Sequence, residues 1–185
     1  MAWLDGILAV TNNDMVGLIA ARAALKVSGG KWTAYLDRSL SAFEMALRGD
    51  RRAAASTMVA LERELAEGSP FFVVRATPHA LLRGVDRLAA AEWLLDQGDG
   101  VQALPLLQWH RALGAFDDKI PLAPLAFLLT AKIEEAQGDT AAARYNYEEF
   151  LHRFDMPMPP QRRLVVEARD ALARLSGATP PITDR

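Results

Sequence analysis

The same four-residue skeleton occurs three times in this chain with identical spacing. Each copy has an alanine, a Gly-Asp pair and a second alanine: Ala42/Gly49/Asp50/Ala54, Ala91/Gly98/Asp99/Ala103 and Ala131/Gly138/Asp139/Ala143. A glycine after a helical run can adopt the left-handed backbone that ends a helix, and the aspartate can accept hydrogen bonds from the first free amides of the next helix. The alanines allow the two helices to approach closely. We therefore predict three antiparallel helical hairpins, and hence an all-α helical-repeat protein.

Helical periodicity predicts about nine helices and no sheet. We expect an N-terminal helical pair in residues 1–30, three hairpins in 31–158, a capping helix in 159–176 and a flexible tail in 177–185. The expected hairpins pair 31–48 with 51–67, 78–97 with 100–114, and 121–137 with 140–154. The capping helix has one apolar face, made of Leu164, Val165, Ala168, Ala171, Leu172 and Leu175. Such a face would cover the open end of a stack of hairpins.

Composition excludes several classes of protein. The chain has 185 residues, of which 51% are hydrophobic, so one folded domain with a sizeable core is expected. A net charge of −2 argues against a broad nucleic-acid surface, and we interpret the pairs Arg51/Arg52 and Arg162/Arg163 as solvated charges. With no cysteine, the chain cannot form disulfides, thiolate metal sites or a cysteine nucleophile, which is compatible with the cytoplasm.

The N-terminal region does not have the pattern of a signal peptide or a membrane span. Asp5 lies close to Met1 and no basic segment precedes the apolar residues. The apolar stretch from Ile7 to Val27 is interrupted by Asn12, Asn13 and Asp14, so neither half could cross a bilayer of about 30 Å. We expect a cytoplasmic protein that does not insert into membranes.

Two apolar connections separate the repeats, at 68–76 and 114–120. The first contains Phe71, Phe72, Val73 and Val74. This segment is either a loop or short strand packed over the edge of the helices, or a lip that binds a partner.

Around these skeletons the chain resembles the tetratricopeptide repeat. The three alanine pairs fall where that motif has small residues, and its large residue of the second helix falls on Met58, Leu107 and Tyr147. The third copy is the most similar, whereas the first two have Met45 and Leu94 where the motif has an aromatic residue. The resemblance implies an α-solenoid of stacked hairpins.

The segment from Leu122 onward is similar to a narrower group of proteins. Its run LAPLAFLLTAKIEEAQGDTAAARYNYEEFLHRF, followed by a proline-containing linker and VVEARDALARL, resembles the C-terminal end of repeat regions in large bacterial signalling proteins. Those proteins include serine/threonine kinases, nucleotide cyclases and transcriptional activators. The resemblance implies a regulatory or sensory role as an alternative function.

Residues that could carry out chemistry are few. His79, His110 and His152 are far apart and lack the spacing of metal ligands, so we predict no metal site and no cofactor. The paired carboxylates Glu134/Glu135 and Glu148/Glu149 are expected on a solvated helix face. No phosphate-binding or nucleophile motif is present, and an enzyme is the least favoured function. Trp93 and Trp109 are expected in the core, and Trp3 or Trp32 could close the end of the stack.

The resemblance also implies where a partner would bind. In a tetratricopeptide stack the first helix of each pair lines a concave groove, which here would present Phe43, Leu47, Glu92, Asp96, Lys132 and Glu135. Such a groove would suit an extended peptide or a helix of another protein. The alternative is that these are only the polar faces of surface helices. We therefore predict a protein-interaction module, without predicting its oligomeric state or the identity of its partner.

Overall fold

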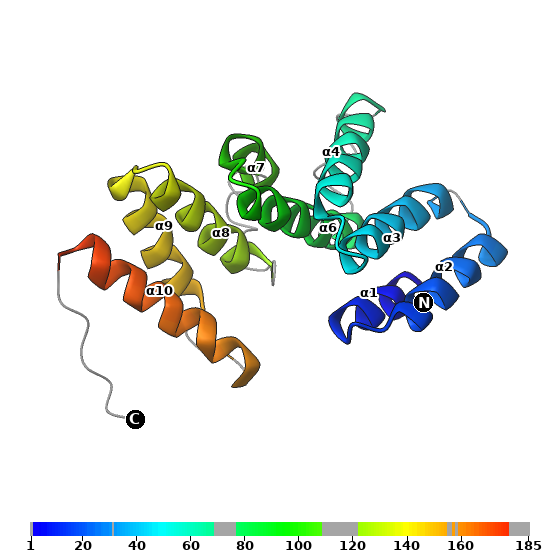
Figure 1. Ribbon diagram of the computed structural model, residues 1–185, viewed down its shortest axis with the longest axis horizontal. Helices are drawn as coiled ribbons and strands as arrows, with labels where there is room; N and C mark the ends of the chain where they lie inside the picture. The colour runs from blue at the N-terminus through cyan, green and yellow to red at the C-terminus, as the bar shows by residue number, and fades with distance from the viewer. Residues whose placement is uncertain are drawn as a thin grey trace. The chain divides into compact units, whose positions relative to one another are not determined.

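The computed structural model describes residues 2–30, 32–68, 77–108, 122–154, 157 and 159–177. Within these ranges the chain forms nine α-helices, one short 3-10 helix and no strand (Figure 1). The elements are α1 (Ala2–Thr11), α2 (Met15–Ser28), α3 (Thr33–Leu47), α4 (Arg51–Gly68), α6 (Thr77–Asp96), α7 (Gly100–Leu107), α8 (Ala123–Ala136), α9 (Thr140–Arg153), η2 (Pro159–Gln161) and α10 (Arg162–Leu175). The all-α prediction is confirmed for this part of the chain.

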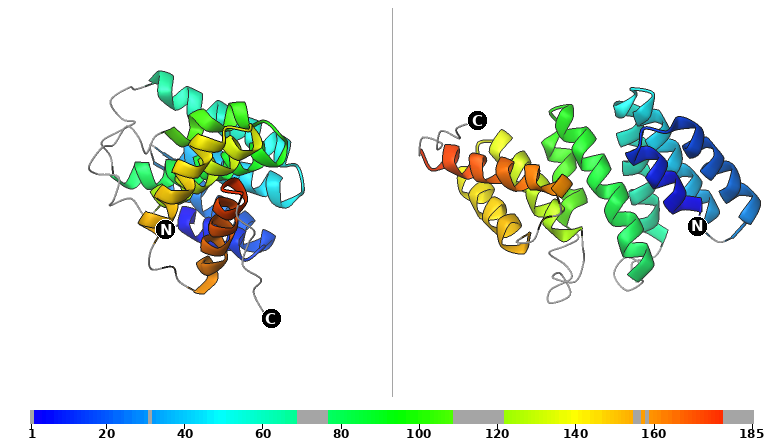
Figure 2. Two further views of the ribbon diagram at one scale, coloured as in Figure 1. Left: turned by 90° about the vertical axis from the view of Figure 1, so that its left-hand side faces the viewer. Right: turned by 90° about the horizontal axis from the view of Figure 1, so that it is seen from below.

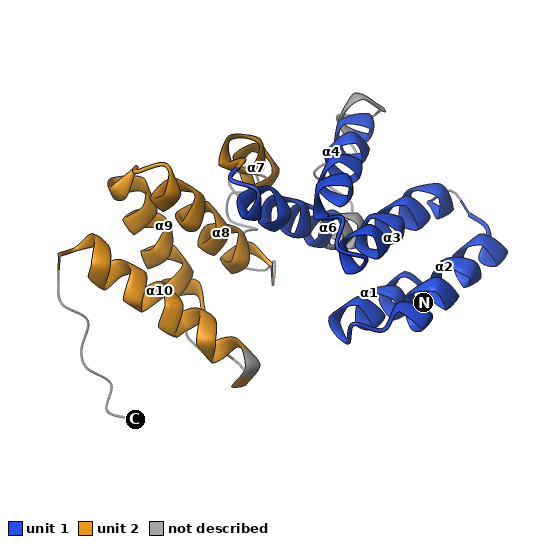
Figure 3. Cartoon of the chain, in the orientation of Figure 1, with its two compact units in different colours: residues 1–98 blue, residues 99–185 orange. Residues whose placement is uncertain are grey.

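The chain divides into two compact units, residues 1–98 and 99–185 (Figure 3). Helices α1 to α6 belong to the first unit and α7 to α10 to the second. The boundary falls at the second Gly-Asp pair, inside the segment 31–158.

The three Gly-Asp pairs form the predicted helix-to-helix turns. Gly49, Gly98 and Gly138 have φ angles of 92°, 78° and 80°, the left-handed region in which a side chain would be strained. Each following aspartate accepts a hydrogen bond from a backbone amide three residues ahead. The N–O distances are 3.0 Å to Ala53, 3.3 Å to Gln102 and 3.1 Å to Ala142. The glycine therefore ends one helix and the aspartate caps the next.

The alanines of the repeated skeleton are all fully buried. None of the six has measurable exposed surface. In the first copy they lie on the contacting helices α3 and α4, and in the third on the contacting helices α8 and α9. This confirms that these two repeats are hairpins closed around small residues.

The first unit packs α1 and α2 onto α3, and α4 onto α6. Gly6 allows α1 to lie close to α3, because a Cβ atom at that position would come within 2.6 Å of Leu40 Cδ1. Trp3 and Trp93 are buried, and the indole nitrogen of Trp3 donates a hydrogen bond to Ser39 on α3. The core of this unit therefore reaches from the first helix to α6.

The second unit contains a core shared by α8, α9 and α10, with α10 lying against α9 (Figure 2). Phe127, Tyr147 and Phe150 pack with Val165, Ala168 and Ala171 of α10. Leu164, Leu172 and Leu175 are half-buried against the same cluster. The predicted apolar face of the last helix is confirmed, and it completes the core of this unit.

Several predicted features lie outside the described residues. They are the apolar segment Phe71–Val74, the connection 114–120, Trp109, His110 and residues 178–185. The helix expected over 100–114 is seen as far as Leu107, with Pro105 inside it.

Candidate functional site

An exposed apolar stripe runs along α2. Val16 and Val27 are 79% and 89% exposed, and Ile19, Ala20 and Ala23 between them are also exposed. These residues recur every three or four positions, so helix geometry places them along one side of α2. We call Val16, Ile19, Ala20, Ala23 and Val27 the α2 stripe.

The opposite side of α2 is buried in the first unit. Leu18, Ala21 and Leu25 form it, and α2 contacts both α1 and α3. A helix with apolar residues on both sides usually packs against other parts of a structure on both sides. In the described part of the chain, α1 and α3 cover one side of α2, and the other side is exposed.

The two basic side chains of α2 are turned toward α3. Arg22 Nε lies 2.9 Å from Asp37 Oδ1, and the same guanidinium donates a hydrogen bond to Glu44. Lys26 Nζ lies 3.6 Å from Asp37 Oδ2. Hydrogen bonds from Arg48 and Arg22 hold the pKa of Glu44 below its usual range, so this carboxylate stays ionised and paired. The α2 stripe itself contains no ionisable side chain.

Exposed apolar residues are concentrated in the first two helices. Of the eight large hydrophobic residues that are exposed in the described part of the chain, five lie in α1 and α2. They are Leu4, Leu8, Val16, Ile19 and Val27. Scattered exposed hydrophobics need no explanation, but a concentration of this kind is typical of an interaction site.

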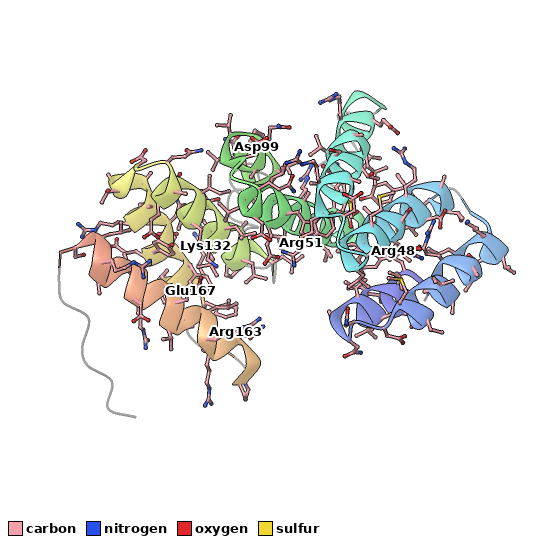
Figure 4. The ribbon with its side chains drawn as sticks, in the orientation of Figure 1. Arg48, Arg51, Asp99, Lys132, Arg163 and Glu167 are labelled. Carbon is pink, nitrogen blue, oxygen red and sulfur yellow. The ribbon has the colours of Figure 1, made fainter. Side chains whose placement is uncertain are left out.

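The predicted groove residues of the first unit have different environments. Phe43 is buried and packs edge-to-face on Trp93, with ring centroids 5.5 Å apart, so it belongs to the core. Leu47 is half-buried. Glu92 and Asp96 are exposed on α6, and Asp96 pairs with Arg51 of α4 (Arg51 is labelled in Figure 4).

In the second unit, both predicted groove residues are bound to α10. Lys132 Nζ lies 2.7 Å from Glu167 Oε1, and both residues are labelled in Figure 4. Glu135 accepts hydrogen bonds from the Tyr147 hydroxyl at 2.7 Å and from Arg174 at 3.1 Å. Both side chains therefore bridge α8 to α10 at the surface of the unit, and a partner that bound them would have to compete with Glu167 and Arg174.

The interpretation of Glu134 and Glu135 as a solvated face is wrong. Both are half-buried, and Glu134 accepts a hydrogen bond from Asn146 Nδ2 at 2.6 Å. The sequence gives no sign of this, because Asn146 and Tyr147 reach the two carboxylates from the neighbouring helix α9. Of the second pair, Glu148 is exposed as expected, whereas Glu149 is half-buried and pairs with Arg153 at 3.0 Å.

A buried polar network, which sequence reasoning did not find, joins α1, α3 and α6. Asp86 is 1% exposed and accepts hydrogen bonds from the Tyr35 hydroxyl at 2.6 Å and the Ser39 hydroxyl at 2.8 Å. Ser39 in turn accepts the 3.3 Å hydrogen bond from Trp3. Each donor is satisfied, which is what a polar group needs when it is removed from water.

A second group of buried polar side chains lies between α4 and α6. Glu62 accepts two hydrogen bonds from Arg83, at 3.1 Å and 2.7 Å, and one from Arg87 at 2.6 Å. Glu62 and Arg83 are buried. The carboxylate of Glu62 therefore pairs with two guanidinium groups that are largely removed from solvent.

Burial controls the protonation of these groups. Desolvation raises the pKa of Asp86 to about 7, although the hydrogen bonds from Tyr35 and Ser39 favour the carboxylate. Burial also raises the pKa of Tyr35 and lowers the pKa of Arg87. The charges of Glu62 and Arg83 also act on Asp86, so the two buried groups of side chains interact electrostatically.

The side chains that are described do not form a metal centre. They contain no group of three or more histidine, cysteine, aspartate or glutamate residues placed to hold a metal ion. Of the three histidines, only the side chain of His152 is described, and it is exposed.

Comparisons with known proteins give no assignment. No family model matches the chain, and neither the curated proteins nor the solved structures contain a match. In the ranges that the structure covers, no helix combines the length and apolar character needed to span a bilayer.

Proposed function

We propose that this chain is a protein-interaction module that binds its partner through the α2 stripe. The observation that carries the proposal is an uncharged apolar stripe on a helix whose other side is already buried. Exposed apolar surface of this kind is costly in water and is typical of binding sites. The helical hairpins and the resemblance to tetratricopeptide repeats support the same function.

The energetics indicate what the partner must provide. Full burial of a valine or isoleucine side chain contributes about 1.5 to 3 kcal/mol. Part of each side chain is already buried in the free chain. Covering the remaining exposed surface of Val16, Ile19 and Val27 would therefore contribute roughly 3 to 6 kcal/mol to binding. Association itself costs about 4 to 15 kcal/mol in lost translational and rotational freedom. The partner must therefore add apolar contacts of its own, and a helix with an apolar face fits this requirement.

A charged partner surface fits less well. A carboxylate, phosphate or ammonium group placed on the α2 stripe would lose hydration without gaining an opposite charge. Helices that lie on anionic lipid present basic residues for the headgroups, whereas Arg22 and Lys26 are paired with α3. These observations favour a protein partner over nucleic acid or a membrane surface.

The experiment is chemical cross-linking in the source cells followed by capture of the tagged chain. Three forms are compared: the wild type, the double variant A20E/A23E, and A141E as a matched control. Ala20 and Ala23 are exposed on the α2 stripe, and Ala141 is exposed on α9 in the other unit.

We expect a defined partner to be cross-linked to the wild type and to A141E but lost with A20E/A23E. Circular dichroism would confirm that all three forms remain helical. Equal capture by all three forms would contradict the assignment of the α2 stripe as the binding surface.

A further inference from the structure

The carboxylate of Asp86 is buried between α3 and α6 among neutral hydrogen-bond donors. It is 1% exposed, and it accepts hydrogen bonds from the hydroxyls of Tyr35 and Ser39 of α3. Ser39 in turn accepts a hydrogen bond from the indole of Trp3 of α1, which also carries no charge. Removing an ionised carboxylate from water costs far more than removing a neutral carboxyl group, unless an opposite charge pairs with it. This arrangement therefore favours the protonated form of Asp86.

The charged groups near Asp86 lie on α4 and α6 and are paired with one another. Arg83 and Arg87 of α6 donate hydrogen bonds to Glu62 of α4. Arg83 attracts the Asp86 carboxylate, but Glu62 repels it, and desolvation is the largest effect, so the pKa of Asp86 is raised to about 7. Burial also raises the pKa of Tyr35, whose hydroxyl therefore stays protonated. Asp86 thus gains or loses a proton near neutral pH.

Helix α6 is held to its two neighbours in different ways (Figure 1). It packs on α4, where Glu62 pairs with two arginines of α6 at 2.7 Å and 2.6 Å. It meets α3 through the hydrogen bonds of Asp86 and through the edge-to-face rings of Phe43 and Trp93. Asp86 and Trp93 are seven positions apart, which places both on one face of α6. A change at Asp86 therefore acts on the contact with α3 and leaves the ion pairs with α4 in place.

We infer that Asp86 is a pH-sensitive clasp between α3 and α6, which holds the two helices together when it carries a proton and loosens α6 from α3 when it loses the proton. Separation returns water to the carboxylate, and the ion pairs of Glu62 keep α6 on α4. The pKa of an aspartate in water is 3.8, against about 7 for Asp86 in the closed arrangement, so separation becomes easier as the pH rises between these values and changes little above pH 7. This local opening is distinct from unfolding of the whole unit, and it does not depend on the α2 stripe.

Thiol labelling of the purified full-length chain tests the inference, because the chain has no cysteine of its own. The variant A90C places a thiol one turn beyond Asp86 on the same face of α6, at a residue with no measurable exposed surface. A21C is the matched control, since Ala21 is a buried alanine of α2, which packs on α1 and α3. Each labelling rate is divided by that of a free thiol, whose reactivity also rises with pH.

Between pH 5 and pH 7, we expect the corrected labelling rate of A90C to rise by up to about tenfold per pH unit, because each opening releases one proton. This rise should be absent in D86N/A90C. At pH 7, low concentrations of urea should change the rate of A90C less than that of A21C, since local opening exposes less surface than unfolding does.

A labelling rate of A90C that does not depend on pH, or the same rise in D86N/A90C, would overturn the inference. Equal rates and equal urea dependence of A90C and A21C at pH 7 would also overturn it, because both thiols would then be reached only by unfolding of the whole unit. This last comparison uses variants that retain Asp86, so it decides the question even if D86N does not fold.

Discussion

The hydroxyl of Tyr35 donates a hydrogen bond to Asp86 Oδ2 over 2.6 Å, although the two residues are 51 positions apart in the chain. Through this bond, and the bonds of Ser39 to Asp86 and of Trp3 to Ser39, helices α1, α3 and α6 share one buried polar network. Buried polar networks rigidify a core when every member is satisfied. The network therefore holds α6 against the helices that support the α2 stripe.

We predict that Asp86 makes the first unit less stable as pH rises toward neutrality. Burial raises its pKa from 3.8 to about 7, so the folded chain holds a proton that the unfolded chain releases. This contribution to stability is complete below pH 3.8 and is lost as the pH rises to about 7, at no more than about 1.4 kcal/mol per pH unit. Urea unfolding at several values between pH 5 and pH 8 measures it.

The matched variant for this prediction is Asp86→Asn, which keeps the shape of the side chain but cannot titrate. Its free energy of unfolding should lack this pH dependence. The same pH dependence in the variant and the wild type would show that Asp86 is ionised throughout.

Replacing Glu62 by glutamine should destabilise the protein by about 3 to 5 kcal/mol, because Arg83 and Arg87 would remain buried with no carboxylate. Glu64→Gln is the control on the same helix. Glu64 pairs with Arg38 at the surface, where water screens the charges, so its loss should have little effect. Thermal unfolding of both variants compares them, and equal melting temperatures would contradict the buried role of Glu62.

The buried alanines of the repeated skeleton should not tolerate larger side chains. Ala143→Leu and Ala103→Leu are expected to cost about 1 to 3 kcal/mol by overpacking. Ala141→Leu should cost less, since Ala141 is exposed on the same helix as Ala143. If urea unfolding gave the same change for all three, the repeat alignment would be wrong.

Two adjacent valines test whether α10 is part of the core of the second unit. Val165 is buried among α8 and α9, whereas Val166 is 55% exposed. Val165→Asp should destabilise the protein by about 3 to 5 kcal/mol, because its carboxylate would be buried without a partner. Val166→Asp should change stability by no more than about 0.5 kcal/mol. Equal effects in thermal unfolding would mean that α10 is not packed as the structure shows.

Local signals in the sequence predicted most of the helices and their turns. A left-handed glycine and a capping aspartate act over a few residues, so the turns at Gly49, Gly98 and Gly138 could be predicted from the sequence. The buried face of α10 could be predicted for the same reason, since it depends on periodicity within one helix. Both are properties of one segment.

Contacts between distant segments could not be predicted in this way. Nothing near Asp86 in the sequence indicates that Tyr35 and Ser39 would reach it, and nothing near Glu135 indicates Arg174. The burial of Phe43 against Trp93 depends on α3 meeting α6, which periodicity within one helix does not specify. The α2 stripe could not be predicted either, because the apolar residues of a helix usually lie in the core, and the exposed side of α2 is recognised only when its packing is known.

The central claim is that a partner covers the exposed α2 stripe when it binds. The most direct test of this claim uses the absence of cysteine in the chain. A single cysteine introduced by Val27→Cys can be labelled with an environment-sensitive fluorophore, with Val101→Cys in the second unit as the control; these valines are 89% and 75% exposed. On titration with the partner captured by cross-linking, we predict a blue shift of the label at position 27 and no shift at position 101. Emission that stays constant at position 27, or shifts equally at both positions, would contradict the account.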